Sequence, residues 1–225
     1  MSYNEIRHKI LCLLIVFCCL HGVNNDCSAI KVAGYILNEN SDTIHGTIQL
    51  SRFNQVTGGF KLNGIELESF HSRVVFKGLN DKSFVTYFPE KITGFGFKYK
   101  YVNYIFNRFV VNHNSIVQNE SQQLRFLCLL YKGSFELYKE ITTMDNPVNK
   151  FVYDQYLTST DYYLHCGSKG LLKVEYNDHF RTLRNLMQQA GVDIRFIQLM
   201  PLNIRFKDIE ALLAIYDRWL MCEKE

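Results

Sequence analysis

Two apolar runs flank Lys132-Gly133 in the stretch from Gln123 to Ile141. This pattern predicts a β-hairpin, in which a tight glycine-containing turn joins two strands whose successive side chains point to opposite faces. We expect Gly133 to supply the positive φ of a two-residue turn, which pairs Arg125 with Glu140 across the strands. A three-residue loop is the alternative, since Lys-Gly is a weaker turn signal than Asn-Gly.

The predicted pairing gives this hairpin two apolar faces. One face carries Cys128, Leu130 and Leu137, and the other carries Leu127, Leu129 and Tyr138. The second face is too apolar to be left in water. We therefore expect that the C-terminal helices cover it, or that the sheet curls over it.

Strand-like patterns of apolar residues recur along most of the chain. They predict strands at 31–37, 42–50, 73–77, 83–88, 91–100, 101–110, 151–158, 161–166 and 171–176. The stretches 113–123 and 142–150 are predicted as loops, and 54–68 as a loop with at most one short strand at 59–62. Gly94 and Gly96, within a predicted strand, indicate a bulge or a close approach of the backbone.

The spacing of apolar residues becomes helical near the end of the chain. Helices are predicted over 178–190 and 206–220, joined by a connection at 193–204. The fold class is therefore α+β: a mainly antiparallel β meander, as a curled sheet or partly open barrel, with two C-terminal α-helices. Residues 30–225 are predicted to form a single domain, because no linker separates the strands from the helices.

The first residues match a secretory signal peptide. Arg7 to Lys9 is basic, and the apolar run Ile10 to Leu20 is too short to anchor the chain in a bilayer. Residues 1–29 are expected to be removed, and the mature chain exported to the periplasm or the cell surface. A lipid anchor on Cys18 or Cys19 is a weaker alternative, since Phe17 stands where a small residue is expected.

Charge, cysteine content and hydrophobicity limit the classes of protein to which the chain can belong. The net charge is +3 and is dispersed, whereas nucleic-acid binding needs a concentrated positive patch. Cys128, Cys166 and Cys222 remain after cleavage, which allows at most one disulfide within a monomer. No second apolar run reaches the length of a membrane helix, so no transmembrane helix is expected in the mature chain.

Residues that could carry chemistry are sparse. The nearest cluster is His165, Cys166 and His179, but neighbouring strand residues point to opposite faces, so convergence on one metal is not expected. Cys166 with His179 as its base is a conceivable nucleophile, with ordinary structural roles the stronger interpretation. No phosphate-binding glycine loop or GxSxG motif is present. We therefore expect no cofactor and no enzyme, with an unrecognised hydrolase as a minor alternative.

The chain is rich in aromatic residues, with 14 Tyr and 17 Phe. High strand propensity explains many of them. Exposed tyrosines also suit contacts with a glycan or a protein. The candidate interaction surface consists of Tyr99, Tyr101, Tyr104, Tyr162 and Tyr163.

Several segments carry a family likeness: Gly34–Ile36, Asp42–Ile48, Val74–Lys77, Tyr87 with Pro89–Phe95, Phe126–Tyr138, Asp161–Leu164 and Ala214–Tyr216. In these segments the chain resembles a group of exported proteins of unknown function that is common in Bacteroidetes. In such proteins this β-rich module sometimes precedes an outer-membrane β-barrel, whereas this chain is expected to be the module alone. Ser41 stands where the group usually has Gly. The resemblance implies export and no particular reaction.

Together these observations predict a non-enzymatic, exported binding or interaction module of the cell envelope. Its partner is expected to be another envelope protein or a glycan. The alternative is a small-ligand carrier, with a cavity inside a barrel-like sheet.

Overall fold

The computed structural model describes residues 29–51, 65–115, 118–145, 156–167, 170–174, 178–201 and 204–223. The predicted signal peptide before Ala29, the short strand at 59–62 and the segment 151–155 lie outside the described residues.

In the described residues, ten antiparallel strands form one sheet in the order β10-β9-β8-β7-β6-β5-β1-β2-β3-β4. The chain runs as two meanders, β1 to β4 and β5 to β10, and they join where β5 pairs with β1. The sheet is open, with β4 and β10 at its edges, so the predicted fold class is confirmed in its curled-sheet form. The strands are β1 Ile30–Leu37, β2 Thr43–Leu50, β3 Val74–Gly78, β4 Val85–Tyr87, β5 Gly94–Tyr99, β6 Val102–Ser115, β7 Gln118–Lys132, β8 Glu136–Asp145, β9 Tyr156–His165 and β10 Leu171–Val174.

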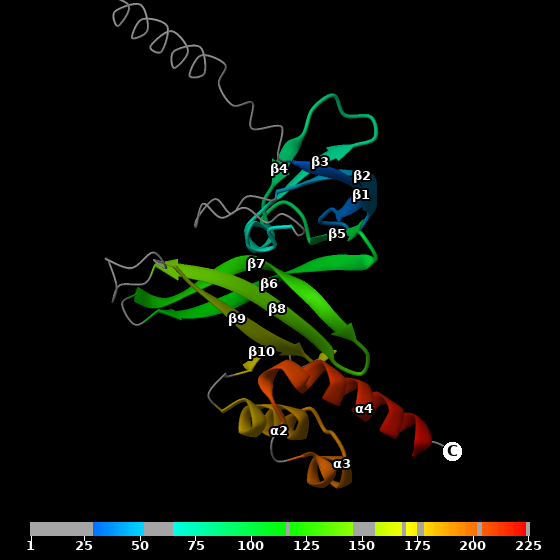
Figure 1. Cartoon of the computed structure of the whole chain (residues 1–225), viewed down its shortest axis with the longest axis vertical. Helices are drawn as coiled ribbons and strands as arrows, with labels where there is room; N and C mark the ends of the chain where they lie inside the picture. Colours follow the sequence, from blue (N-terminus) through cyan, green and yellow to red (C-terminus); the bar gives the residue numbers. More distant parts are fainter. Residues whose placement is uncertain are drawn as a thin grey trace, which may run out of the picture.

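Helices gather at one end of the molecule, beside β8 to β10 and far from β1 to β4 (Figure 1). They are α2 His179–Gln189, α3 Ile194–Leu199 and α4 Ile209–Cys222, with the 3-10 turn η5 Phe206–Asp208 before α4. The sequence predicts α2 and α4, but α3 lies in the expected connection. The Asp193 side chain caps α3 by accepting a hydrogen bond from the Arg195 backbone N–H at 2.8 Å. The prediction considered only the spacing of apolar residues and therefore missed this short helix.

The N-terminal part of the sheet curls around the short 3-10 helix η2, Glu68–His71. Phe70 of η2 lies between the rings of Phe95, Phe97 and Phe106, at centroid distances of 5.7, 5.3 and 5.5 Å. Ile36, Ile48 and Phe76 also belong to this cluster, which we call the Phe70 core. A loop residue that fills a curved sheet in this way has no periodic signature, so η2 was not predicted.

A second core lies between the sheet and the helices, and we call it the helical core. Leu137 of β8 and Leu164 of β9 pack there against Leu183 of α2, Phe196 of α3 and Leu213 of α4. All three helices therefore cover the sheet face that carries Leu137. The opposite face, with Leu127 and Tyr138, is buried in a third cluster whose described members all belong to strands.

The central hairpin exists, but its predicted register is wrong. Lys132 pairs with Glu136, so the loop has the three residues of the alternative prediction, and beside the turn the strands are three residues out of the predicted register. A bulge between Leu129 and Tyr131 reduces this offset to two residues. Leu129 consequently lies opposite Tyr138, two residues from its predicted partner. A shift of two residues keeps every side chain on its face, which is why the predicted faces are correct although the pairs are not.

Two predicted loops are strand instead. β6 extends to Ser115 and β7 begins at Gln118, so the polar stretch 113–123 is mostly the far end of a long hairpin. β8 extends to Asp145, into the loop predicted at 142–150. Backbone pairing, for example of His113 with Ser121, requires no alternation of apolar residues, so the hydrophobic pattern did not reveal these strand segments.

Candidate binding site on the outer face of the sheet

The sheet face that points away from the Phe70 core is called the outer face. Residues that alternate with core residues lie on it. In β1, Ile36 enters the core and Tyr35 lies on the outer face; in β2, Ile48 enters the core and Thr47 does not. Phe97 of β5 likewise belongs to the core, which places Lys98 on the outer face.

An open hollow of about 480 Å³ lies where β2, β1, β5 and β6 run side by side. Glycines on three neighbouring strands belong to its lining, and two of them, Gly46 and Gly96, are themselves buried. Tyr35 lies across Gly96 so closely that a Cβ on Gly96 would meet the Tyr35 hydroxyl at 2.6 Å. The lining consists of Ala33, Gly34, Tyr35, His45, Gly46, Leu79, Gly96, Phe97, Lys98, Asn103, Tyr104 and Ile105.

The hollow offers apolar contact with a few hydrogen-bond donors at its margin. Tyr35 and His45 pair directly across β1 and β2, with their rings in edge contact at 6.4 Å. Burial raises the pKa of Tyr35, so its hydroxyl stays neutral and can donate. Leu79 is 79% exposed at the rim. A pocket of this size can hold one large side chain of a partner.

Three of the five predicted interface tyrosines lie near this hollow. Tyr104 belongs to its lining, but its ring stacks on Phe97 at 5.1 Å and packs against the Phe70 core. Tyr99 also packs against that core. Tyr101, in the turn between β5 and β6, is 97% exposed. The hydroxyl-bearing residue best placed in the hollow is instead Tyr35, which the prediction omitted.

The other two predicted tyrosines lie on β9, in the other half of the sheet. Tyr162 packs against the helical core. Tyr163 is 3% exposed and belongs to the cluster of Leu127 and Tyr138. The structure therefore does not bring the five tyrosines together on one surface, and Tyr163 is closed to a partner.

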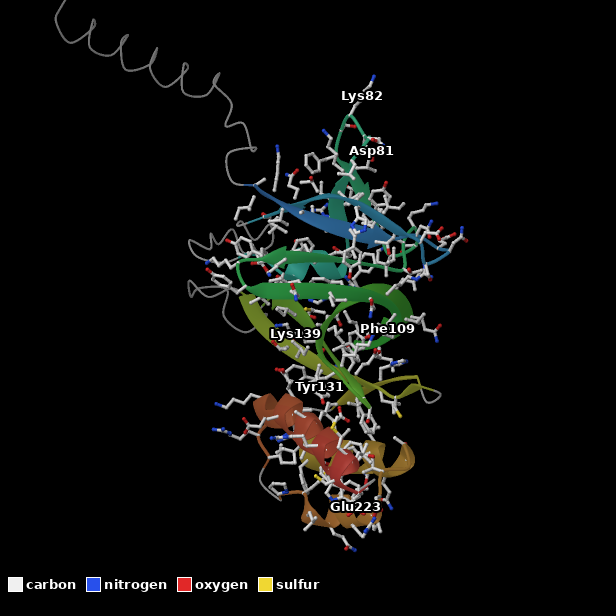
Figure 2. All side chains as sticks on the ribbon, turned by 90° about the vertical axis from the view of Figure 1, so that its right-hand side faces the viewer. Asp81, Lys82, Phe109, Tyr131, Lys139 and Glu223 are labelled. Carbon is white, nitrogen blue, oxygen red and sulfur yellow. The ribbon has the colours of Figure 1, made fainter. Side chains whose placement is uncertain are left out.

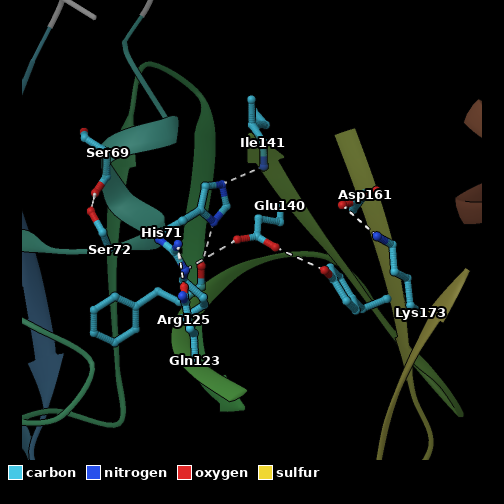
Figure 3. Close-up of polar contacts among 11 residues, drawn as sticks. Ser69, His71, Ser72, Gln123, Arg125, Glu140, Ile141, Asp161 and Lys173 are labelled. Carbon is cyan, nitrogen blue, oxygen red and sulfur yellow. Dashed lines mark hydrogen bonds and ion pairs between the residues drawn. The ribbon is translucent and has the colours of Figure 1, made fainter. Parts of the chain in front are cut away.

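A buried polar network joins η2 to the hairpin of β7 and β8 (Figure 3). The His71 Nδ1–H donates to the Phe126 carbonyl oxygen at 2.6 Å, and Nε2 accepts from the Ile141 backbone N–H at 3.0 Å. His71 thus bridges β7 and β8 beyond the last backbone pairs between them. Burial lowers its pKa, although the bond to Phe126 and the charge of Glu140 oppose this effect.

Glu140 lies beside this histidine and is almost completely buried. It accepts a hydrogen bond from the Tyr163 hydroxyl at 3.1 Å and faces Arg125 Nε at 3.9 Å. Arg125 and Glu140 were predicted to meet across the strands, and the ion pair is present despite the wrong register. Burial, followed by the charge of Glu140, raises the pKa of Tyr163. This buried network fixes the strands relative to η2.

A second polar group lies on the outer face near the end of β9. Glu136 accepts hydrogen bonds from the Tyr138 hydroxyl at 2.8 Å and pairs with His165 Nδ1 at 3.1 Å. Asn107 donates to Tyr138 at 2.9 Å, and Phe109 packs on both the tyrosine and the histidine ring. These contacts hold β6 against β8 and β9 across the curl of the sheet.

The cluster of His165, Cys166 and His179 does not converge. His165 contacts Phe109 on the outer face, Cys166 packs against the helical core, and His179 bonds the Ile204 carbonyl oxygen. In the described part of the chain, no group of three or more His, Cys, Asp or Glu side chains could hold a metal ion. Cys128, Cys166 and Cys222 are all free thiols, and burial raises the pKa of Cys128 to about 11.

Comparison with protein-family models, with curated proteins and with solved structures finds no match for this chain. Across the described ranges, no helix is long and apolar enough to cross a membrane. The described residues form an open-sheet α+β protein with a hollow on one face of the sheet.

The hollow was not predicted, although part of its signal is in the sequence. Gly34, Gly46 and Gly96 each interrupt a strand pattern, and such glycines mark close backbone approaches. Their convergence depends on the pairing of Gly34 with Gly46, and of Tyr35 with Gly96. The second pairing follows from the return of β5 to β1, which the alternation of side chains cannot reveal.

Proposed function

We propose that this protein is an exported, non-enzymatic binding module of the cell envelope, and that its partner protein binds at the glycine-lined hollow. The observation that carries the proposal is the hollow itself, an apolar space of about 480 Å³ with Leu79 exposed at its rim. Export is supported by the signal-peptide pattern of residues 1–29.

The geometry favours binding over the two alternatives. A hydrolase needs convergent polar groups in a cleft, whereas the buried His71 and Glu140 side chains bond strand atoms. A carrier of the predicted kind needs a cavity inside a closed sheet. This sheet is open, and the hollow lies on its outer face.

Site-specific photo-crosslinking in the native cells tests the proposal. A tagged full-length chain carries p-benzoylphenylalanine in place of Leu79, or in place of Leu199 of α3, which is 71% exposed at the helical end. We expect a defined protein adduct from position 79 and none of the same mass from position 199. The mass of the purified chain also reports whether residues near 1–29 have been removed.

Filling the hollow provides the matched control. Ala33 is exposed in the lining and Ala211 is exposed on α4, so each accepts a larger side chain without disturbing a core. Ala33→Trp should abolish the adduct at position 79, and Ala211→Trp should leave it unchanged. Equal adducts from both crosslinker positions, or an adduct that survives Ala33→Trp, would show that the hollow is not the binding site.

A further inference from the structure

The strands around the hollow carry charges of one sign, although the β3–β4 turn with the rim residue Leu79 also contains Asp81. The strands β1 to β5 contain no Asp or Glu, and their charged residues are Lys31, Lys77 and Lys98. The whole chain, by contrast, has 25 basic and 22 acidic residues, nearly in balance. The balance of charges in this part of the sheet therefore differs from that of the rest of the molecule.

All three lysines lie on the outer face. Lys31 pairs with Gln49 next to the core pair Val32 and Ile48. Lys77 pairs with Thr47, and Lys98 pairs with Asn103 in the lining of the hollow. Alternation along each strand directs these lysines away from the Phe70 core.

The lysines also keep their charge available. Among the described residues, no ion pair joins Lys31, Lys77 or Lys98 to a carboxylate, whereas Lys132 and Lys173 have acidic partners. Lys31 contacts the face of the Phe84 ring at 5.4 Å, which leaves it positive. His45 adds a further basic group in the hollow, whose lining includes no carboxylate.

We infer that the outer face of β1 to β5 binds an acidic segment of a partner protein, with one apolar side chain in the hollow and carboxylates against Lys31, Lys77 and Lys98. This inference rests on the proposed function. Complementary charge around an apolar anchor steers association and selects the partner.

A neutral glycan fits this site less well. Sugar hydroxyls need acceptors as well as donors, and Asn103 supplies the only side-chain amide in the lining. An acidic glycan would match the lysines, but it would leave Leu79 uncovered at the rim. Burying this aliphatic side chain favours a protein segment.

The crosslinker at position 79 also tests this inference. In that background we compare the variant Lys31→Glu, Lys77→Glu, Lys98→Glu with a control of equal charge change, Lys82→Glu, Lys91→Glu, Lys207→Glu. The control lysines are exposed and lie outside the strands; Lys82 is at the tip of the β3–β4 turn (Figure 2). Thermal unfolding of both variants verifies that they are folded.

We expect the adduct yield to fall about tenfold in the strand variant and to stay within about twofold of the parent in the control. Mass spectrometry of the adduct should place Asp or Glu within a few residues of the crosslinked position. A synthetic peptide with that sequence should bind the chain, and replacing its acidic residues by Asn and Gln should weaken binding about tenfold.

These results distinguish failure of the acidic-partner inference from failure of the proposed function. If an adduct forms but its yield is equal in the two variants, or its segment lacks acidic residues, the acidic-partner inference is wrong and the binding site stands. An adduct with an acidic glycan would also overturn the inference. If no adduct forms at position 79 in the parent chain, the proposed function itself fails.

Discussion

His71 is a single residue on which two distant parts of the chain depend. Its Nε2 can accept the Ile141 N–H only in the neutral ring, because protonation turns that nitrogen into a donor. At 2% exposure the charged ring would also lack solvation. Both effects agree with the lowered pKa.

This residue predicts a pH dependence of stability. The pKa of His71 is lowered in the folded state relative to about 6.5 in the unfolded chain, so the unfolded state binds more protons as the pH falls. The free energy of unfolding should therefore have its maximum contribution from His71 above pH 6.5. Below that value it should decrease by up to about 1.4 kcal/mol per pH unit, until the folded-state pKa is reached.

The variant His71→Gln isolates this effect, since an amide can donate and accept but does not titrate. Urea unfolding of both proteins between pH 7.5 and about 5 measures it. The stability difference between parent and variant should shrink as the pH falls. A difference that stays constant over this range would contradict the assignment of the pH dependence to His71.

At the scale of elements, helix α4 determines the shape of the central hairpin. Asp217 of α4 accepts hydrogen bonds from the Tyr131 hydroxyl and from the Ser134 backbone N–H. A Cβ on Gly133 would lie 1.7 Å from the Asp217 carboxylate. Gly133 does not have the positive φ that the turn prediction requires; in the described chain the glycines with positive φ are Gly167, Gly170 and Gly191. Gly133 leaves room for the Asp217 carboxylate, which is hydrogen-bonded to the hairpin.

Gly133→Ala should therefore destabilise the protein by about 1–3 kcal/mol, because the Asp217 carboxylate must give up its hydrogen bonds to the hairpin to make room. The penalty should be smaller in an Asp217→Ala background, where the clash is gone although two hydrogen bonds are also lost. A double-mutant cycle in urea measures the coupling. Equal costs of Gly133→Ala in both backgrounds would mean that the carboxylate is not what excludes a side chain at this position.

At the scale of the whole molecule, the protein has two main cores on one continuous sheet. The Phe70 core holds β1 to β6 together, and the helical core holds α2, α3 and α4 on β8 and β9. β7 connects them, since Phe126 and Cys128 belong to the Phe70 core while Leu130 packs against the helical core. The strands β1 to β5 lie far from the helices (Figure 1). They carry the three lysines and most of the lining of the hollow, and the Phe70 core supports them.

This division predicts local loss of protection when one core is weakened. Leu183→Ala in α2 and Ile48→Ala in β2 each remove a fully buried side chain, which should cost about 2–5 kcal/mol. Amide hydrogen exchange should rise mainly in β8 to β10 for the first variant and in β1 to β3 for the second. An equal rise across all strands in both variants would show that the sheet opens as one unit.

Residue patterns alone predict the strand-rich character, the two longer helices and the two faces of the central hairpin. These follow from periodicity, which is set by neighbours along the chain and survives a register shift of two residues. The return of β5 to β1, the cover of the Leu137 face by the helices and the contact of Gly133 with Asp217 are visible only in the folded chain. The tertiary structure also placed Lys31, Lys77 and Lys98 around three glycines on one face. Each of these depends on contacts between residues far apart in the chain, and no local pattern encodes which distant partner a residue will meet.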